Sequence, residues 1–228
     1  IDGAIRIDDL VKKAKECNMP AVAITDHGNM FGAIEMYKEC KKNGIKPIIG
    51  CEFYVAPRSR LDKDGRIDTE PNHLILLAMN NVGYKNIVKL CSIGYTEGFY
   101  YKPRIDLEVL EKYNEGIICL SACIAGGLSR KIINGDIVGA KEMLEKYLSI
   151  FGKDRYFLEL QDNKLREQIL VNQNLIEFSK EYGIGLVATN DCHYLNKEDY
   201  DFHEVLLCIQ TRKTIDDEDR LRFKVNEF

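Results

Sequence analysis

Short apolar runs recur along the chain and are separated by longer polar stretches. Most of these runs, such as AVAIT and HLILLA, are nearly continuous rather than alternating, which is typical of strands buried on both faces of a sheet. The pattern predicts six strands, over residues 21–25, 47–55, 73–78, 116–120, 156–160 and 185–189.

Amphipathic stretches lie between several of the predicted strands. In residues 8–17 the apolar side chains share one stripe and three lysines lie outside it, which predicts a helix with Asp8 or Asp9 as its N-cap. Gly183 follows the last such stretch and is the expected C-cap. The other predicted helices cover residues 29–43, 137–151 and 164–182. This alternation predicts βαβ units and a parallel sheet, either doubly wound or closed as a barrel.

Two segments interrupt the strand–helix pattern. Residues 58–71 are polar, with Gly and Pro among them, and are expected to form a surface loop whose arginines and lysine face solvent. Residues 94–106 resemble a second loop, although three aromatic side chains are unusual in a purely solvated segment. No linker is recognisable, so we expect one domain over residues 1–228, with a C-terminal helix and tail from about residue 197.

Composition narrows the class of protein. The 228 residues carry 32 Lys and Arg against 36 Asp and Glu, so overall charge would not attract a polyanion. No apolar stretch approaches the roughly 20 residues that a membrane-spanning helix needs. The eight cysteines form no CxxC pair, which favours a reduced, cytoplasmic compartment over a disulfide scaffold. No GxGxxG or GxxxxGK[ST] motif follows a strand, so nucleotide-binding versions of the fold lose support.

Metal-ligating residue types follow several of the predicted strands. Asp26 and His27 follow the first strand, Glu52 lies in the second, Cys123 follows the fourth, and Asp191 and His193 follow the last. Because the carboxyl ends of parallel strands converge on one face, these side chains are expected to meet there. This mixture of imidazole, carboxylate and thiolate suits zinc or manganese.

These residues also have simpler interpretations than metal binding. Asp191 and His193 would project to one side of an extended segment, whereas His73 opens its predicted strand instead of ending it. Any one of these histidines could be a structural, hydrogen-bonded residue, and Cys123 could be a small core residue. We interpret His203 as structural too. Ser121 and Cys123 could also be nucleophiles, but no GxSxG motif is present.

Seven motifs resemble one family in the order in which they occur. They are TDHGNMFG, GCEFYV, NHLILLA, GFYYKPRID, SACIAG, TNDCHYL and LLCIQTRKTIDDEDRLRF. Together they resemble the N-terminal PHP (polymerase and histidinol phosphatase) domain of bacterial replicative DNA polymerase III alpha subunits. The resemblance implies an α/β fold, a distorted seven-stranded (β/α) barrel, with a metal cluster of about nine ligands at one end. It also implies that the first barrel strand, with an HxH pair, precedes Ile1.

The resemblance assigns roles to particular residues. Asp26, Glu52 and Asp191 would be catalytic, Glu52 as a bridging carboxylate. Tyr100, Tyr101, Lys102 and Arg104 would meet DNA or neighbouring domains. Arg212 departs from the family pattern, which usually has Gly there. The implied metal ligands are Asp2, His27, Glu52, His73, Cys123, Asp191 and His193.

The activity implied by the resemblance is metal-assisted phosphodiester hydrolysis, as a 3′–5′ exonuclease that uses two or three Zn²⁺ or Mn²⁺ ions. The parent protein would be a DNA-directed DNA polymerase that uses Mg²⁺, and hydrolysis by the isolated segment would be weak. Implied partners are the 3′ end of the primer strand, the other polymerase domains, a proofreading subunit and the sliding clamp. The alternative is a catalytically silent module that stabilises the polymerase or docks a proofreading subunit. A free-standing PHP phosphatase fits GFYYKPRID and the RLRF tail less well.

Overall fold

The computed structural model describes residues 3–222. All six predicted strands are confirmed, and each differs from the prediction by one residue at one end. The strands are β1 (Ala21–Ile24), β2 (Lys46–Val55), β3 (Asn72–Ala78), β4 (Phe99–Tyr100), β5 (Lys102–Ile105), β6 (Ile117–Leu120), β7 (Tyr156–Gln161) and β8 (Leu186–Thr189). The short hairpin of β4 and β5 was not predicted, because residues 94–106 lack the length and apolar character of a buried strand.

The helices include the four predicted ones and several others. The helices are α1 (Ile7–Glu16), α2 (Ala33–Asn43), α3 (Asn81–Thr96), α4 (Leu107–Lys112), α5 (Gly127–Ile133), α6 (Ile137–Phe151), α7 (Arg166–Tyr182), the 3₁₀ turn η1 (Lys197–Asp199) and α8 (Tyr200–Thr211). Gly183 is confirmed as a left-handed C-cap. The predicted N-cap of α1 is wrong: Arg6 holds that position, and Asp8 and Asp9 lie in the first turn, where carboxylates favour the helix dipole.

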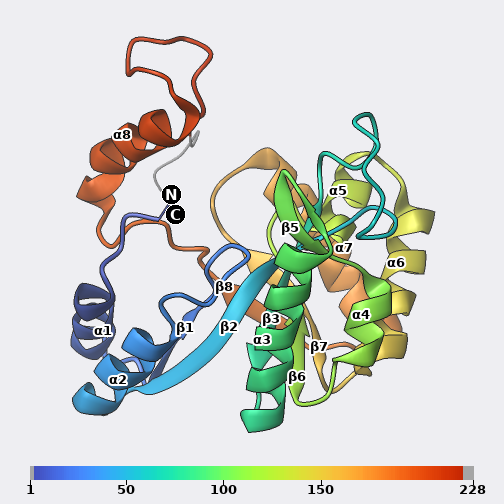
Figure 1. Ribbon diagram of the computed structural model, residues 1–228, viewed down its shortest axis with the longest axis horizontal. Helices are drawn as coiled ribbons and strands as arrows, with labels where there is room; N and C mark the ends of the chain where they lie inside the picture. The colour runs from blue at the N-terminus through green and yellow to red at the C-terminus, as the bar shows by residue number, and fades with distance from the viewer. Residues whose placement is uncertain (1–2, 223–228) are drawn as a thin grey trace.

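The sheet is mixed, not parallel as the strand–helix alternation suggested. Its order is β4-β5-β2-β3-β6-β7-β8, and β1 pairs in parallel with the first half of β2. Strand β3 runs antiparallel to both of its neighbours, β2 and β6, whereas β6, β7 and β8 are parallel. The sheet curls as part of a barrel, with α1 and α2 beside β1 and with α4 to α7 grouped on the other side (Figure 1). The predicted α/β barrel is thereby confirmed as a partial barrel with an antiparallel strand.

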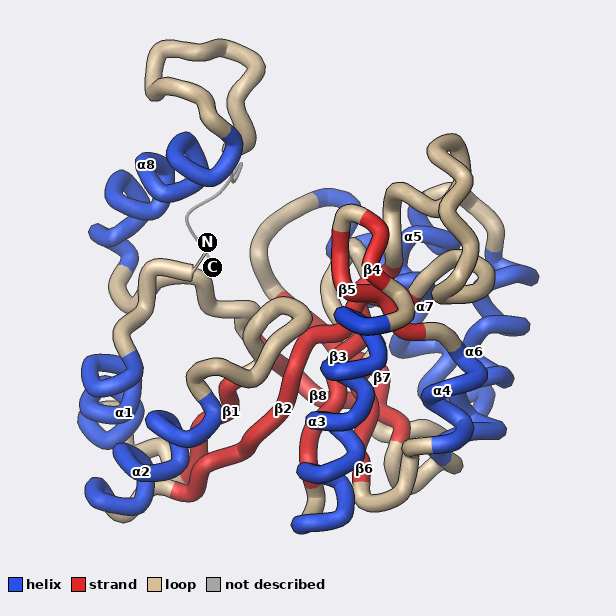
Figure 2. Tube along the Cα trace, in the orientation of Figure 1, coloured by secondary structure: helices blue, strands red, loops and turns tan. Residues whose placement is uncertain are grey.

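Alternation along the strands separates two faces of this sheet. Cys51, Phe53, Leu74 and Leu76 belong to the main core beneath the helices. The residues between them face the inside of the curl, where Ile75 packs in a smaller cluster with residues of β6 and β8. Figure 2 shows α1 and α2 on one side of the curled strands and α4 to α7 on the other, with α8 apart from them. Apolar side chains therefore line the middle of the inner face, and its polar side chains lie toward one edge.

The loop of residues 58–71 forms no strand or helix, as predicted, but two of its charged side chains are not solvated. Arg60 and Asp68 are buried. The Arg60 guanidinium donates to the carboxylate of Asp106, the N-cap of α4, and forms an ion pair with Glu97. The expectation that the whole basic group faces solvent is therefore wrong for Arg60. None of the helices in the described range is long and apolar enough to cross a membrane.

Candidate metal centre

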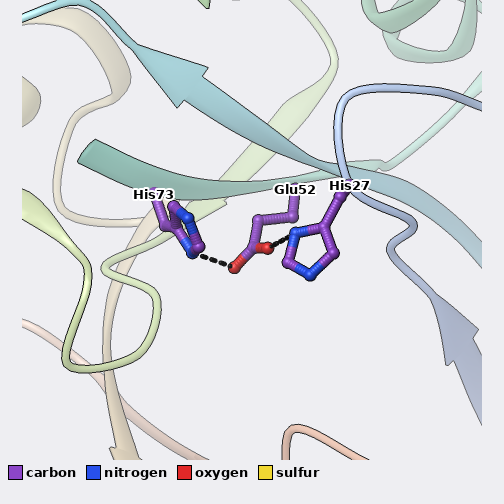
Figure 3. Close-up of side chains that lie close together, drawn as sticks. All are labelled: His27, Glu52 and His73. Carbon is purple, nitrogen blue, oxygen red and sulfur yellow. Dashed lines mark ion pairs between the residues drawn. The ribbon is translucent and has the colours of Figure 1, made fainter. Parts of the chain in front are cut away.

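Three strands bring His27, Glu52 and His73 together. His27 follows β1 and forms a parallel bridge with Glu52 of β2. Because β3 is antiparallel, its first residues lie at the edge where β1 ends, and His73 pairs with Tyr54 of β2. This direction of β3 explains why His73 opens its strand and still reaches the others (Figure 3).

Glu52 lies between the two imidazole rings. Its Oε1 is 3.1 Å from Nδ1 of His73, and its Oε2 contacts Nδ1 of His27. The side chain is buried, with Glu52 only 4% exposed. Burial alone would raise the pKa of Glu52, but the contacts with His27 and His73 outweigh it and lower this pKa to about 2. Glu52 is therefore an ionised carboxylate at neutral pH.

These three residues fit a divalent cation. Each offers one ligand atom, and the three atoms lie within 4.8 Å of one another. Two imidazole nitrogens and a carboxylate oxygen are a donor set suited to zinc or manganese. Because Glu52 is ionised and buried, a cation there would also offset a charge that is costly to hold in the interior.

Cys123 and Asp191 lie beside this group. Sγ of Cys123 is 3.7 Å from Nδ1 of His73. Burial, followed by the charges of Asp191 and Glu52, raises the pKa of Cys123 well above its usual value. Burial also raises the pKa of Asp191. The Cys123 thiol is thus neutral unless a cation favours its thiolate.

The end of β8 differs from the extended geometry expected for Asp191 and His193. Asp191 has a φ of +51°, in the left-handed region, so the two side chains do not project together from an extended strand. Instead, Nδ1 of His193 lies 2.7 Å from the backbone oxygen of Asp191, and the His193 ring centroid is 6.3 Å from that of His27. The turn places both residues near the histidine group by a different route.

The structure also places Asp26 and His203. Asp26 is exposed, and its backbone oxygen accepts hydrogen bonds from the Glu52 amide and the Cys51 thiol. Asp2 lies outside the described residues. His203 is fully buried, and its ring centroid is 5.8 Å from that of His193. The interpretation of His203 as structural stays a prediction.

Tyr54 was not predicted to belong to the site. Its ring lies 6.1 Å from the His27 ring and 5.4 Å from the His73 ring, measured between centroids. It follows Glu52 by two residues on β2, so strand alternation would have placed it on the same inner face. Its ring therefore packs beside both histidine rings.

The four residues expected to meet DNA or other domains separate into two groups. Tyr101 is 69% exposed, Tyr100 is half-buried, and the Lys102 ammonium lies 5.3 Å from the centre of the Tyr54 ring. Arg104 is fully buried. Its guanidinium donates to backbone oxygens of the chain itself, so the expectation that Arg104 meets DNA or a neighbouring domain is wrong for this structure.

Comparison with known proteins decides the family. The family model of the PHP domain matches residues 1–163. The chain belongs to the PHP domain family. The whole of this PHP chain is 50% identical over 229 residues to the DNA polymerase III subunit alpha of Borreliella burgdorferi, and 50% identical over 232 residues to that of Thermus aquaticus. These matches confirm the resemblance found in the sequence. The chain spans about a fifth of the length of these relatives.

Solved structures support the same fold. A putative metal-dependent phosphoesterase from Bifidobacterium adolescentis superposes with a TM-score of 0.54 at 12% identity, covering 84% of each chain. A two-domain protein from Bacteroides vulgatus that contains a predicted PHP-like metal-dependent phosphoesterase gives 0.53 at 14% identity, covering 90% of this chain and 52% of the other. At such low identity these likenesses establish only the PHP-type fold.

Proposed function

We propose that the chain is the PHP domain of a bacterial DNA polymerase III alpha subunit and that it hydrolyses phosphodiester bonds from the 3′ end of DNA. The match of the whole chain to about a fifth of the length of an alpha subunit supports the parent protein. The observation that carries the hydrolytic proposal is the buried, ionised Glu52 between His27 and His73, three residues whose ligand atoms can share one cation.

In this proposal, His27, Glu52 and His73 hold one divalent ion. Cys123, Asp191 and His193, together with Asp2, complete a site for two or three Zn²⁺ or Mn²⁺ ions. When bound, such ions activate water and stabilise charge on the phosphate and on the leaving 3′ oxygen.

The chain's own groups then have distinct roles. Glu52 holds the two imidazoles in place through its two oxygens. Asp191 supplies a second carboxylate near the same group. Asp26 is exposed next to His27 and can accept a proton at its carboxylate. Tyr100, Tyr101 and Lys102 lie on exposed or half-exposed positions of the β4–β5 hairpin, where they could contact the DNA strand or a neighbouring domain.

The parent protein sets the cellular context of the proposal. As part of a DNA-directed DNA polymerase, the domain would work in the cytoplasm with primer DNA, the other polymerase domains, a proofreading subunit and the sliding clamp. The polymerase reaction itself would use Mg²⁺ at residues outside this chain.

A nuclease assay with matched variants tests the proposal. A 5′-labelled single strand incubated with the chain and Mn²⁺ should be shortened from its 3′ end, and Glu52→Gln or Asp191→Asn should abolish this shortening. Glu35→Gln, on an exposed position of α2, is the control and should retain the wild-type rate. Equal hydrolysis by Glu52→Gln and the wild-type chain would contradict the proposal and would favour a domain that only stabilises the polymerase or docks a proofreading subunit.

A further inference from the structure

Glu159 is a buried carboxylate on the inner face of the curled sheet. Its neighbours Tyr156 and Leu158 on β7 belong to the core beneath the helices. Phe157 lies in the smaller inner cluster, and strand alternation places Glu159 on that inner side. Glu159 is only 4% exposed. It was not among the residues that the sequence indicated.

The contacts of Glu159 reach both neighbouring strands. Its Oε1 accepts a hydrogen bond from the Thr189 hydroxyl and another, at 3.2 Å, from Nε2 of Gln161. Its backbone N–H donates to the Ser121 hydroxyl at 2.8 Å. One residue therefore joins the ends of β6, β7 and β8.

These contacts lie next to the candidate metal centre. Thr189 is the last residue of β8 and precedes Asp191 by two residues. Ser121 follows β6 and precedes Cys123 by two residues. The two chain segments that supply Asp191 and Cys123 are thus each hydrogen-bonded to Glu159 two residues before these proposed ligands.

Stability alone does not account for a carboxylate at this position. Among the described residues, Oε2 of Glu159 has no hydrogen-bond partner. Burial raises the pKa of Glu159 by more than its hydrogen bonds with Thr189 and Gln161 lower it, and the nearby charges of Asp191 and Glu52 raise it further. A buried acid with an unbonded oxygen opposes folding, which points to a role other than holding the sheet together.

We propose that Glu159 is a positioning residue of the metal centre, which fixes the exit of β8 through the Thr189 hydroxyl so that Asp191 and His193 reach the ion. The inference rests on the proposed function, because it requires that the centre bind metal. Groups that orient metal ligands in this way typically change metal affinity by about 10- to 100-fold when they are removed.

Metal-binding measurements on the full chain test this role. Mn²⁺ affinity would be measured by the loss of the free-ion electron paramagnetic resonance signal. Glu159→Met, which keeps the size but removes the acceptor, and Thr189→Val, which removes the donor, should each bind Mn²⁺ about 10- to 100-fold more weakly. Glu159→Gln and Thr189→Ser keep the hydrogen bond and should stay within about threefold of wild type. The double variant Glu159→Met/Thr189→Val should lose no more than either single variant, because both remove one interaction.

Controls separate positioning from a general loss of structure. Tyr156→Phe alters β7 on its other face and should leave Mn²⁺ affinity unchanged. Each variant would also be unfolded in urea without metal. The visible spectrum of bound Co²⁺ should change in Glu159→Met, because the ligands of the ion are no longer held in the same geometry. Unchanged affinity in Glu159→Met, an equal loss in Glu159→Gln, or a loss matched by Tyr156→Phe would overturn the inference. A wild-type chain that binds no Mn²⁺ or Co²⁺ would instead refute the metal site itself.

Discussion

We predict that Arg104 stabilises the fold and does not contact DNA. Its Nε donates to the Gly98 backbone oxygen at 3.0 Å, and Nη1 donates to that of Asp68 at 3.1 Å. Its Nη2 donates to the backbone oxygens of Arg60 at 3.0 Å and Asp62 at 2.8 Å. The residue is fully buried. A single guanidinium therefore fastens the loop of residues 58–71 to the β4–β5 hairpin.

The cost of removing this side chain follows from these four bonds. Hydrogen bonds to charged groups contribute about 1.5–3 kcal/mol each, although such contributions do not add fully. Arg104→Ala also leaves buried carbonyls without donors, so we expect a loss of about 4 kcal/mol or more in the free energy of unfolding. Arg104→Lys offers only one point of donation in place of a planar fork. We expect it to lose about 2–3 kcal/mol.

Urea unfolding of the metal-free chain, followed by circular dichroism, measures these losses. Lys102→Ala is the matched control, because Lys102 is an exposed base two residues away, and it should change stability by less than about 0.5 kcal/mol. Single-stranded DNA binding would be followed by fluorescence anisotropy. If Arg104→Lys unfolds like wild type but binds DNA more weakly, the structural role of Arg104 is refuted.

Three further predictions concern other parts of the chain. In metal-free protein, the lowered pKa of Glu52 contributes stability above pH 4.5 that is lost as the pH falls toward about 2. Urea unfolding at several pH values measures this loss, which should be about 3 kcal/mol in the wild-type chain and absent in Glu52→Gln. Gly83→Ala should lower stability by about 1–3 kcal/mol, since its Cβ would lie 1.8 Å from the Gly116 backbone oxygen; a wild-type melting temperature would contradict this. Asp68→Asn should lower the urea midpoint by weakening the paired contact with Arg58, and an unchanged midpoint would show that this pair contributes nothing.

The strands could be predicted because buried runs such as HLILLA carry a strong apolar signal. Their direction could not, since a continuous apolar run reads the same for a parallel and an antiparallel neighbour. The reversed β3 therefore escaped the sequence analysis, and with it the reason that His73 belongs to the site. Helix α2 begins at Ala33, later than predicted, because the Asn29 side chain bonds to the backbone of His27 and Phe31 and forms a turn there.

The site was predicted as far as residue type and strand ends could indicate it. His27, Glu52 and His73 meet as expected. The burial of Arg104 depends on carbonyls of a loop about 40 residues earlier in the chain, which no local pattern reveals. Glu159 and Tyr54 were missed for a simpler reason: both lie inside apolar strands, where alternation would have shown their shared inner face once the direction of each strand was known.

Metal content per chain, measured by elemental analysis after dialysis, tests the central claim most directly. The wild-type chain should retain zinc or manganese in a fixed ratio to protein, and His27→Ala and Glu52→Gln should each lose it while remaining folded by circular dichroism. A wild-type chain that retains no metal, or variants that retain as much as wild type, would contradict the assignment of His27, Glu52 and His73 as a metal centre.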